Sequence, residues 1–516
     1  MEAKQSMNKK KWLWRLFKRR VVVIIALVLQ AAFIVYAVST GSQFSQRFSG
    51  LMTLLSIIAV LYIINRKDKG AFKTTWVFLI LSFPLFGGLM YFIFLMQTTS
   101  KKNEQKVKNA RQKSAPLYEL DACTYDAAIS ALPSASTQIR YLTHHADFPI
   151  YDHTDTAYYS PGEMVFEAIL EELEKAEEYI FLEFFIVDEG IMWDSILEVL
   201  KRKAAQGVKV RVMYDDIGCF LLLPSDYPKQ LAAMGIECVK FNPFRPFLTV
   251  QQNNRDHRKI ISIDGKTVFT GGFNLADEYI NAKEKFGHWK DSGIKIQGKA
   301  AWSFTLMFLE MWQISTGCDE DFSQYLPDFS DSKSSEGFVH PYADIPMDNE
   351  NVGEHVYLQI LNHAQDYVYI CTPYLIVDDS MLSALCLAAK SGVDVRIITP
   401  QRWDKWPIHM TTRSYYRDLL KNGVKVYEYS GGFMHSKTFV SDDHTATVGT
   451  VNLDFRSMYL HYECGTVLYK TSAIPQIKED FLHTMESCHQ ITEEDCHPNI
   501  FLRLFQDILR LFAPLM

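Results

Sequence analysis

Residues 206–216, QGVKVRVMYDD, and residues 391–401, SGVDVRIITPQ, are two copies of one sequence element. In each copy a glycine is followed by a run of apolar residues typical of a β-strand. A helical pattern precedes each copy, and a buried-strand pattern precedes each helix. Such alternation indicates βαβ units, and its recurrence predicts an internally duplicated α/β body. The predicted elements are strands over 179–187, 208–214, 367–372 and 393–399, and helices over 164–177, 196–205 and 381–390.

The composition is that of a folded protein with several domains. The chain has 516 residues, of which 48% are hydrophobic and 22% are charged. These values exclude a disordered or low-complexity chain. The net charge of −7 argues against a general nucleic-acid binder. The nine cysteines include no C-x-x-C pair, which argues against a zinc site or a disulfide framework.

Charge and hydropathy differ along the chain. Residues 1–113 carry 19 Lys and Arg against 3 Asp and Glu, whereas the rest of the chain is acidic. The basic region contains three apolar stretches, at residues 21–38, 51–64 and 76–96. The first and third are long enough to span a bilayer. They predict N-terminal transmembrane helices, two or three in number, that precede the α/β body.

Several properties of this anchor stay open. A signal peptide is the alternative for residues 21–38, but no clear cleavage site follows and further apolar stretches do. Residues 51–64 are short enough to form a core helix instead of a span. The distribution of Lys and Arg around the stretches does not decide which side of the membrane the body faces.

Changes in composition define the expected domains. A segment rich in Ser, Asp and Pro separates the two α/β halves. The C-terminal residues form an amphipathic pattern that suits either a membrane surface or docking onto the body. The expected division is an N-terminal anchor over 1–97, a linker leading into the body over 98–140, a first domain over 141–326, a linker over 327–351, a second domain over 352–498 and an amphipathic helix over 499–516.

The residues that indicate chemistry form a second duplicated pattern. Each half contains one His-x-Lys-x-x-x-x-Asp motif, followed by a small pair and an asparagine. Every member of the second set lies 178 residues after its counterpart, which argues against chance. The sets are His257, Lys259, Asp264 and Asn274 in the first half, and His435, Lys437, Asp442 and Asn452 in the second.

These residue types suit transfer of a phosphate-linked group. Residues two apart in a strand share a face, so each histidine is expected beside its lysine. Two imidazoles, two ammonium groups and two carboxamides around one cavity would hold an anion. One histidine can attack phosphorus while the other serves as general acid and then general base. Because the lysines supply positive charge, neither a metal nor a cofactor is expected.

An attacking imidazole also needs an acceptor for its other ring nitrogen. Glu463 is the predicted partner of His435, and Asp291 is that of His257. The 178-residue offset places Lys285 opposite Glu463, so Asp291 is the weaker assignment.

The motif aspartates Asp264 and Asp442 are candidate catalytic residues by their place in the motif. They lie five residues after the lysines, so a continuing strand does not turn them toward the same cavity. Support of a loop, or pairing with a cation, is therefore favoured over direct chemistry.

The doubled motif resembles that of the phospholipase D superfamily. Further stretches are similar to its bacterial cardiolipin synthases, and the resemblance covers about residues 50–516. They include FGHWKDSGIKIQG at 286–298, GFMHSKTFVSDD at 432–443 and GTVNLDFRSMYLHYE at 449–463. The resemblance implies two tandem phospholipase D-like α/β domains that form a pseudo-twofold body with the active site at their interface.

The resemblance also implies an activity. A phosphatidyl group would pass from one phosphatidylglycerol to another through a phosphohistidine, giving cardiolipin and glycerol. His257 would be the nucleophile and His435 the acid and base. The groups implied to bind phosphate are Lys259, Lys437, Asn274 and Asn452.

Other activities remain open at this point. A phospholipase D-type phosphodiesterase would use water or another alcohol as acceptor, and a phosphatidylserine synthase would share the motif. The acidic body argues against a nuclease. Intact motifs argue against a non-catalytic scaffold.

The expected partners are phosphatidylglycerol and anionic membrane lipids, without nucleic acid and without an evident obligatory protein. The expected location is the bacterial cytoplasmic membrane, as a multi-pass protein.

Overall fold

The computed structural model describes residues 43–83, 101–244, 253–330, 335–348, 350–497 and 499–516, together with the single residues 28, 32, 35, 87, 88, 90 and 91. The chain divides into two compact units. The N-terminal unit contains residues 1–100, 244–253 and 507–516, and the other unit, here called the body, contains residues 101–243 and 254–506.

Besides its C-terminal segment, the N-terminal unit contains two helices whose bounds the structure gives. They are α2 (Gln43–Ile64) and α3 (Gly70–Ser82). Ile63 on α2 packs with Trp76 and Ile80 on α3 in a small apolar cluster. The apolar residues at 51–64 and at the start of 76–96 are therefore helical, as predicted.

The prediction of transmembrane helices is not confirmed. Among the described residues, no helix is both long enough and apolar enough to cross a membrane. The α2 helix has the length, but it begins with the polar run QFSQRFSG, which restricts its apolar part to 51–64. Residues 21–38 lie outside the described residues apart from 28, 32 and 35, and residues 84–86, 89 and 92–96 of the third stretch lie outside them too.

The first half of the body is built on a seven-stranded sheet of order β1-β8-β6-β5-β2-β3-β4. The β2, β3 and β4 strands are parallel, as expected for βαβ units, and the other neighbours are antiparallel. The strands are β1 (Thr154–Tyr159), β2 (Tyr179–Phe184), β3 (Lys209–Asp215), β4 (Glu237–Phe241), β5 (Ile260–Ile263), β6 (Thr267–Gly271) and β8 (Gly293–Gly298).

Helices cover both faces of this sheet, which explains why β2 is apolar throughout. Ile180 and Leu182 join the core cluster that includes the α8 and α9 residues. On the other face Phe181 stacks on Phe308 of α11, with ring centroids 4.8 Å apart. The helices of this half are α8 (Gly162–Leu173), α9 (Ile191–Ala205), α10 (Tyr227–Ala232) and α11 (Ala301–Thr316).

The second half repeats this arrangement around an eight-stranded sheet of order β19-β13-β12-β10-β15-β16-β18-β9. Its β10, β12 and β13 strands are parallel. The strands are β9 (Phe338–Asp344), β10 (Tyr367–Cys371), β12 (Asp394–Pro400), β13 (Lys425–Tyr429), β15 (Thr438–Ser441), β16 (Thr445–Gly449), β18 (Glu463–Tyr469) and β19 (Cys488–Gln490). The helices are α12 (Val352–His363), α13 (Asp379–Lys390), α14 (Trp406–Lys421) and α16 (Ala473–Glu486).

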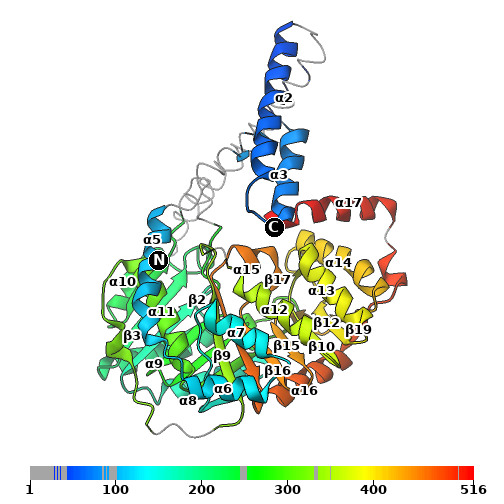
Figure 1. Cartoon of the computed structure of the whole chain (residues 1–516). Coiled ribbons are helices and arrows are strands. Elements are labelled where there is room, and N and C mark those ends of the chain that lie inside the picture. The colour runs from blue at the N-terminus through cyan, green and yellow to red at the C-terminus, as the bar shows by residue number, and fades with distance from the viewer. Residues whose placement is uncertain are drawn as a thin grey trace. The chain divides into compact units, whose positions relative to one another are not determined.

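The strands and helices predicted from the duplicated pattern are present, with small differences at their ends. In Figure 1 the two halves lie side by side, the first in green and the second in yellow to red. The duplicated α/β body is therefore confirmed as two mixed sheets, each flanked by helices.

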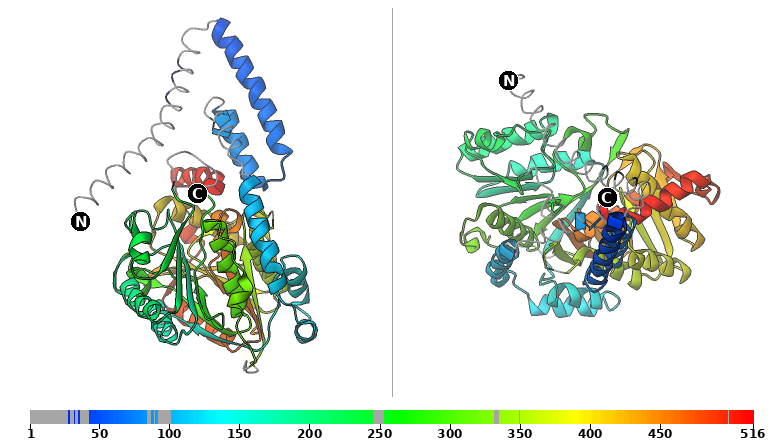
Figure 2. Two further views of the ribbon diagram at one scale, coloured as in Figure 1. Left: turned by 90° about the vertical axis from the view of Figure 1, so that its left-hand side faces the viewer. Right: turned by 90° about the horizontal axis from the view of Figure 1, so that it is seen from above.

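The predicted linkers are more structured than expected. Residues 327–351 contain β9, which pairs along its whole length with β18 and so belongs to the second sheet. Residues 98–140 contain α5 (Lys101–Ser114), α6 (Ala122–Ala131) and part of α7 (Ser136–His144). The basic α5 helix packs against α11 (Figure 2). Lys106 Nζ on α5 donates a 3.2 Å hydrogen bond to the carbonyl of Ile314 on α11.

The C-terminal helix is confirmed as α17 (Ile500–Leu511). Within the body, Phe505 stacks on Trp406 with ring centroids 5.3 Å apart, while Ile500 and Phe501 are exposed. The remaining helices are α15 (Phe455–Tyr459) and the short 3-10 helices Ala115–Leu117, Asp277–Ile280, Phe322–Tyr325, Glu494–Cys496 and Ala513–Leu515.

Short strand pairs connect the two halves. Strand β7 (His288–Lys290) of the first half runs parallel to β14 (Gly432–Met434) of the second. An isolated parallel bridge between Asp256 and Tyr462 is the reciprocal contact. Each contact lies directly before a His-x-Lys pair, so the joint between the halves is also where the motifs meet. A second short sheet, β11 (Leu375–Ile376) with β17 (Leu453–Asp454), lies within the second half.

Candidate active site

Each motif histidine is held by the backbone of the opposite half. The His257 amide donates a 2.9 Å hydrogen bond to the carbonyl of Tyr462, and the His435 amide donates one of 2.8 Å to the carbonyl of Lys290. Both histidines precede the regular strands β5 and β15 instead of lying within them, which differs from the prediction. These inter-half contacts, rather than strand periodicity, fix the two histidines.

The two lysines are buried beside the histidines. Lys259 Nζ and Lys437 Nζ each donate a 2.6 Å hydrogen bond to the carbonyl of the histidine two residues earlier. Burial lowers the pKa of His257 well below its usual value, and the charges of Lys259 and Lys437 lower it further. The pKa of His435 is likewise lowered by burial and by both lysines. The structure therefore brings the four groups of the two motifs into one site.

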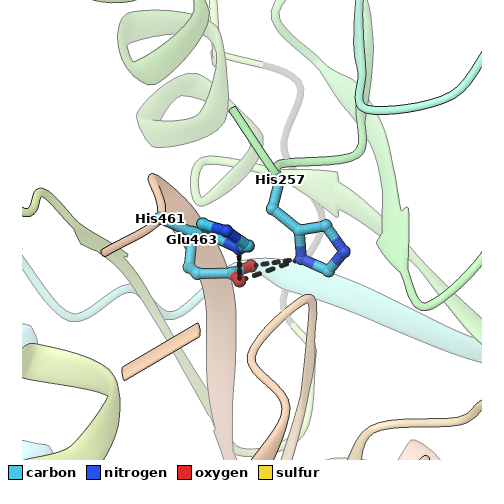
Figure 3. A group of neighbouring side chains, drawn as sticks. All are labelled: His257, His461 and Glu463. Atoms are coloured by element: carbon cyan, nitrogen blue, oxygen red, sulfur yellow. Dashed lines mark hydrogen bonds and ion pairs between the residues drawn. The ribbon is translucent and has the colours of Figure 1, made fainter. Parts of the chain in front are cut away.

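The histidine–carboxylate pairs cross between the halves. His257 Nδ1 lies 2.9 and 3.0 Å from the two carboxylate oxygens of Glu463 (Figure 3). His435 Nδ1 lies 2.7 Å from Asp291 Oδ2. Both carboxylates are completely buried. Asp291 and Glu463 thus do contact the two histidines, but the predicted pairing was wrong, because each contacts the histidine of the other half.

A difference in loop length explains the wrong pairing. The segment from the motif asparagine to the carboxylate is six residues longer in the first half than in the second. Beyond the asparagines the matching offset is therefore 172 residues, which relates Asp291 to Glu463 and removes Lys285 from the comparison. Lys285 instead forms an ion pair with Glu278.

The carboxylates are themselves oriented by groups that the sequence did not reveal. Thr450 donates its hydroxyl to Glu463 Oε2. The Ser292 amide donates to Asp291 Oδ1 at 2.9 Å. Since a carboxylate accepts, His257 presents N–H at Nδ1 and keeps a lone pair at Nε2, as a nucleophile needs. Thr450 follows Gly449 in the small pair of the second half. Its residue type and position alone did not indicate a contact with Glu463.

The protonation of the site is balanced near neutral pH. Burial lowers the pKa of Lys259 to about 8 and that of Lys437 to about 7. Burial also raises the pKa of Asp291 to about 7. The pKa of Asp291 is thus raised while that of its partner His435 is lowered, so the two groups compete for one proton, which suits a pair that acts as both acid and base.

The two asparagines are placed differently. Asn274 accepts a 3.0 Å hydrogen bond from the Ile186 amide and donates one of 2.7 Å to the Tyr279 hydroxyl. The Tyr279 ring in turn lies 5.5 Å from the His435 ring. Asn452 is buried, and its Oδ1 has no hydrogen-bond partner among the described residues. Asn274 therefore holds Tyr279 beside the His435 ring, and in the part of the chain that the structure describes the side-chain oxygen of Asn452 is left without a partner.

The motif aspartates lie at the opposite ends of their strands from the histidines. Asp264 accepts hydrogen bonds of 2.7–2.8 Å from three consecutive amides, 177–179, at the start of β2. Asp442 accepts three of 2.8–2.9 Å from amides 365–367, at the start of β10. Both residues have positive φ, 50° and 52°, in tight turns. This geometry is the one that loop support requires, the role that the sequence favoured.

A buried acid outside the motif holds the segment that carries His257. Asp215, at the end of β3, accepts hydrogen bonds from the Arg255 guanidinium at 2.7–3.0 Å and from the Asp256 amide at 3.1 Å. Asp215 is the last residue but one of the quoted element QGVKVRVMYDD, and the second copy has Pro400 at that position. Its role could not be separated from turn formation by sequence alone.

One group in the site has the donor set of a metal centre. Among the described residues, His257, His461 and Glu463 offer ligand atoms that all lie within 4.8 Å of one another. Figure 3 shows the His461 ring above the carboxylate and beside the His257 ring. Burial lowers the pKa of His461 to about 4, so this ring is neutral.

Comparisons with known proteins agree with this architecture. The family described as cardiolipin synthase, PLD-like domain, matches residues 169–302 and 357–485, and the family described as phospholipase D-nuclease N-terminal matches residues 54–94. A cardiolipin synthase of Geobacillus kaustophilus is 35% identical over 91% of this chain and 94% of its own. An uncharacterized protein of Streptococcus mutans is 41% identical over 89% of this chain and 99% of its own.

The fold has a counterpart among solved structures. The phosphatidylserine synthase of Haemophilus influenzae superimposes with a TM-score of 0.56 at 16% identity, covering 73% of this chain and 97% of that one. At this identity the likeness concerns the fold alone.

Proposed function

Because the chain belongs to the cardiolipin synthase family with phospholipase D-like domains, we propose that it transfers a phosphatidyl group from one phosphatidylglycerol to another, giving cardiolipin and glycerol. The observation that carries the proposal is the crossed pair of buried histidine–carboxylate contacts with two buried lysines between them. One pair serves the attack on phosphorus, and the other serves proton transfer.

In the first step His257 Nε2 attacks phosphorus. A nitrogen–phosphorus bond forms as the bond to the glycerol oxygen of the headgroup breaks. Glu463 holds the Nδ1 proton of His257 and stabilises the positive charge that develops on the ring. The His435–Asp291 pair supplies the proton that the leaving glycerol oxygen takes.

In the second step the free hydroxyl of another phosphatidylglycerol attacks the phosphohistidine. His435, now able to accept a proton, removes it from this hydroxyl as the new oxygen–phosphorus bond forms. The nitrogen–phosphorus bond breaks, and His257 returns to its neutral state. Water in place of the lipid hydroxyl would give phosphatidic acid instead, which is the activity of a phospholipase D.

Cations and amides are proposed to hold the phosphate through both steps. Lys259 and Lys437 supply charge to the non-bridging oxygens, the role that metal ions have in other phosphoryl transfers. Asn452 and the second N–H of Asn274 are the amide donors of this site. The burial of both lysines supports this role, since a buried cation is costly unless an anion joins it.

We further propose that the chain works at a membrane as a multi-pass protein of the bacterial cytoplasmic membrane. The substrate is a bilayer lipid, and apolar stretches occupy residues 21–38 and 76–96. The basic helix α5 would favour anionic headgroups, at about 1 kcal/mol per Lys or Arg near the surface.

The test uses the full-length protein in detergent micelles with phosphatidylglycerol as sole lipid and no added metal. Cardiolipin, phosphatidic acid and glycerol are followed by thin-layer chromatography and mass spectrometry. Cardiolipin with an equal amount of glycerol supports the proposal. Phosphatidic acid and glycerol without cardiolipin would replace it with a phospholipase D activity on the same site.

A further inference from the structure

His461 is a buried histidine for which the proposed reaction has no use. Only 11% of its side chain is exposed, yet neither ring nitrogen has a hydrogen-bond partner among the described residues. Glu463 Oε1 lies 3.8 Å from His461 Nδ1, which is within ion-pair distance but beyond hydrogen-bonding range. A buried imidazole without a hydrogen bond is costly, which suggests that the ring nitrogens of His461 serve to bind a ligand.

The pseudo-symmetry shows that this imidazole is specific to one half. His461 lies two residues before Glu463, and Trp289 lies two residues before Asp291. The rings are placed alike, since His461 lies 5.5 Å from the His257 ring and Trp289 lies 5.2 Å from the His435 ring. An indole packs equally well but cannot ligate a metal ion. The two rings therefore pack against the motif histidines in the same way, but only His461 can coordinate a metal ion.

We propose that His257 Nδ1, His461 and Glu463 form a reversible binding site for a divalent transition-metal ion of the Zn²⁺ type. Two imidazoles and a carboxylate are a common zinc ligand set. Ligand atoms about 2.0–2.1 Å from a tetrahedral Zn²⁺ are separated by roughly 3.4 Å. The distances of 2.9 Å from His257 Nδ1 to Glu463 Oε1 and 3.8 Å from His461 Nδ1 to the same oxygen lie on either side of this value. Small side-chain rotations would therefore complete the site, with a water molecule as fourth ligand.

Occupancy would inhibit the proposed reaction. The ion would replace the proton on His257 Nδ1 and release it to solvent, so Glu463 would bind metal instead of orienting the nucleophile. The ion would also withdraw electron density from the ring whose Nε2 attacks phosphorus. Lys259 and Lys437 oppose a cation electrostatically, while Glu463 offsets one of these charges, so we expect reversible binding. The inhibitory consequence rests on the proposed function, but the site itself does not.

The binding test uses Co²⁺ as the probe with the full-length protein in detergent. Tetrahedral nitrogen and oxygen ligation gives visible d–d absorption without the near-ultraviolet band of thiolate ligands, which separates this site from the nine free cysteines. We expect one such equivalent in the wild type and its loss in His461→Phe. The His461→Trp variant, which copies the ring at position 289, serves if the phenylalanine variant fails to fold.

A matched control is His355→Phe. His355 Nδ1 also lies 2.9 Å from a glutamate oxygen, that of Glu350, but its pair belongs to no three-ligand group among the described residues. This variant should keep the full Co²⁺ signal. Absence of the signal in the wild type, or its persistence in both His461 variants, overturns the proposal.

An activity measurement adds the consequence. The Zn²⁺ concentration for half-inhibition, taken relative to each protein's own metal-free rate, should rise at least tenfold in the His461 variants and stay unchanged in His355→Phe. Equal sensitivity in all proteins would overturn the inhibitory role. If the protein proves to have another activity, the Co²⁺ spectra still decide whether the site exists.

Discussion

His257 in the first half of the body places its Nδ1 atom 2.9 Å from Oε1 of Glu463, a residue of the second half that lies 206 positions later in the chain. The reciprocal contact, from His435 Nδ1 to Asp291 Oδ2, spans 144 positions. Each half therefore supplies the carboxylate that orients the other half's histidine. The proposed catalytic unit is divided between the halves in both directions.

The crossed pairs make a specific prediction for the two carboxylates. Glu463→Gln and Asp291→Asn should each slow transfer by about 10²- to 10⁴-fold, because the amide favours the wrong imidazole tautomer. The ¹⁵N signals of the His257 ring should change in Glu463→Gln and not in Asp291→Asn, with the reverse for His435. A His435 response to Glu463→Gln would contradict the crossed pairing, and unchanged melting temperatures would serve as the control for folding.

The two histidines should be separately indispensable. His257→Ala and His435→Ala are each expected to abolish cardiolipin formation, since neither the phosphohistidine nor the proton transfers can then be completed. Lipid association and thermal unfolding should stay near those of the wild type. Wild-type-like turnover by either variant would rule out the two-histidine mechanism.

The motif aspartates should affect stability and not chemistry. Asp442→Ala leaves three backbone amides without their acceptor and should cost about 1–3 kcal/mol in the free energy of unfolding. Activity below the melting temperature should persist. The neighbouring Asp443→Ala is the matched control, because Asp443 is mostly exposed and pairs with Lys478; it should change stability by less than about 0.5 kcal/mol. Loss of activity in Asp442→Ala at unchanged stability would contradict this prediction and indicate that Asp442 takes part in the reaction.

Substrate binding should weaken as the pH rises. A lysine is charged below its pKa and neutral above it, and burial lowers the pKa of Lys437 to about 7 and that of Lys259 to about 8. The KM for phosphatidylglycerol is therefore expected to rise by about tenfold between pH 7 and pH 9.

The control for this pH dependence is Lys437→Arg, in which the guanidinium stays charged throughout the range. Its KM should vary less with pH than that of the wild type, whatever the effect on kcat. A wild-type KM that is flat from pH 7 to pH 9 would contradict the role of the lysine charges.

Much of the fold could be predicted because its signals are local and repeated. The apolar runs at 179–187 and 367–372 become β2 and β10 because each is covered on both faces, a condition that shows directly in the residue types. Strand β9 was missed because it follows a Ser- and Asp-rich segment and gains its place only by pairing with β18, which is distant in sequence.

The motif residues could be predicted for the same reason, since two copies in register reveal each other. The pairing of Asp291 and Glu463 could not, because a constant offset fails where one loop is six residues longer. Thr450 acts through a hydrogen bond to a buried carboxylate, and Asp215 acts through hydrogen bonds from a guanidinium and a backbone amide. Such contacts leave no periodicity or spacing from which to infer them.

The reciprocal contacts also have a consequence for biosynthesis. A ribosome makes His257 and Lys259 long before it reaches residue 463, so during that interval the nucleophile has no partner to set its tautomer. The emerging first half can fold its own sheet while remaining unable to react with lipid. The site would become active only when β18 packs against it. A truncated chain that ends before β18 would therefore be inactive, instead of an unregulated lipid phosphodiesterase.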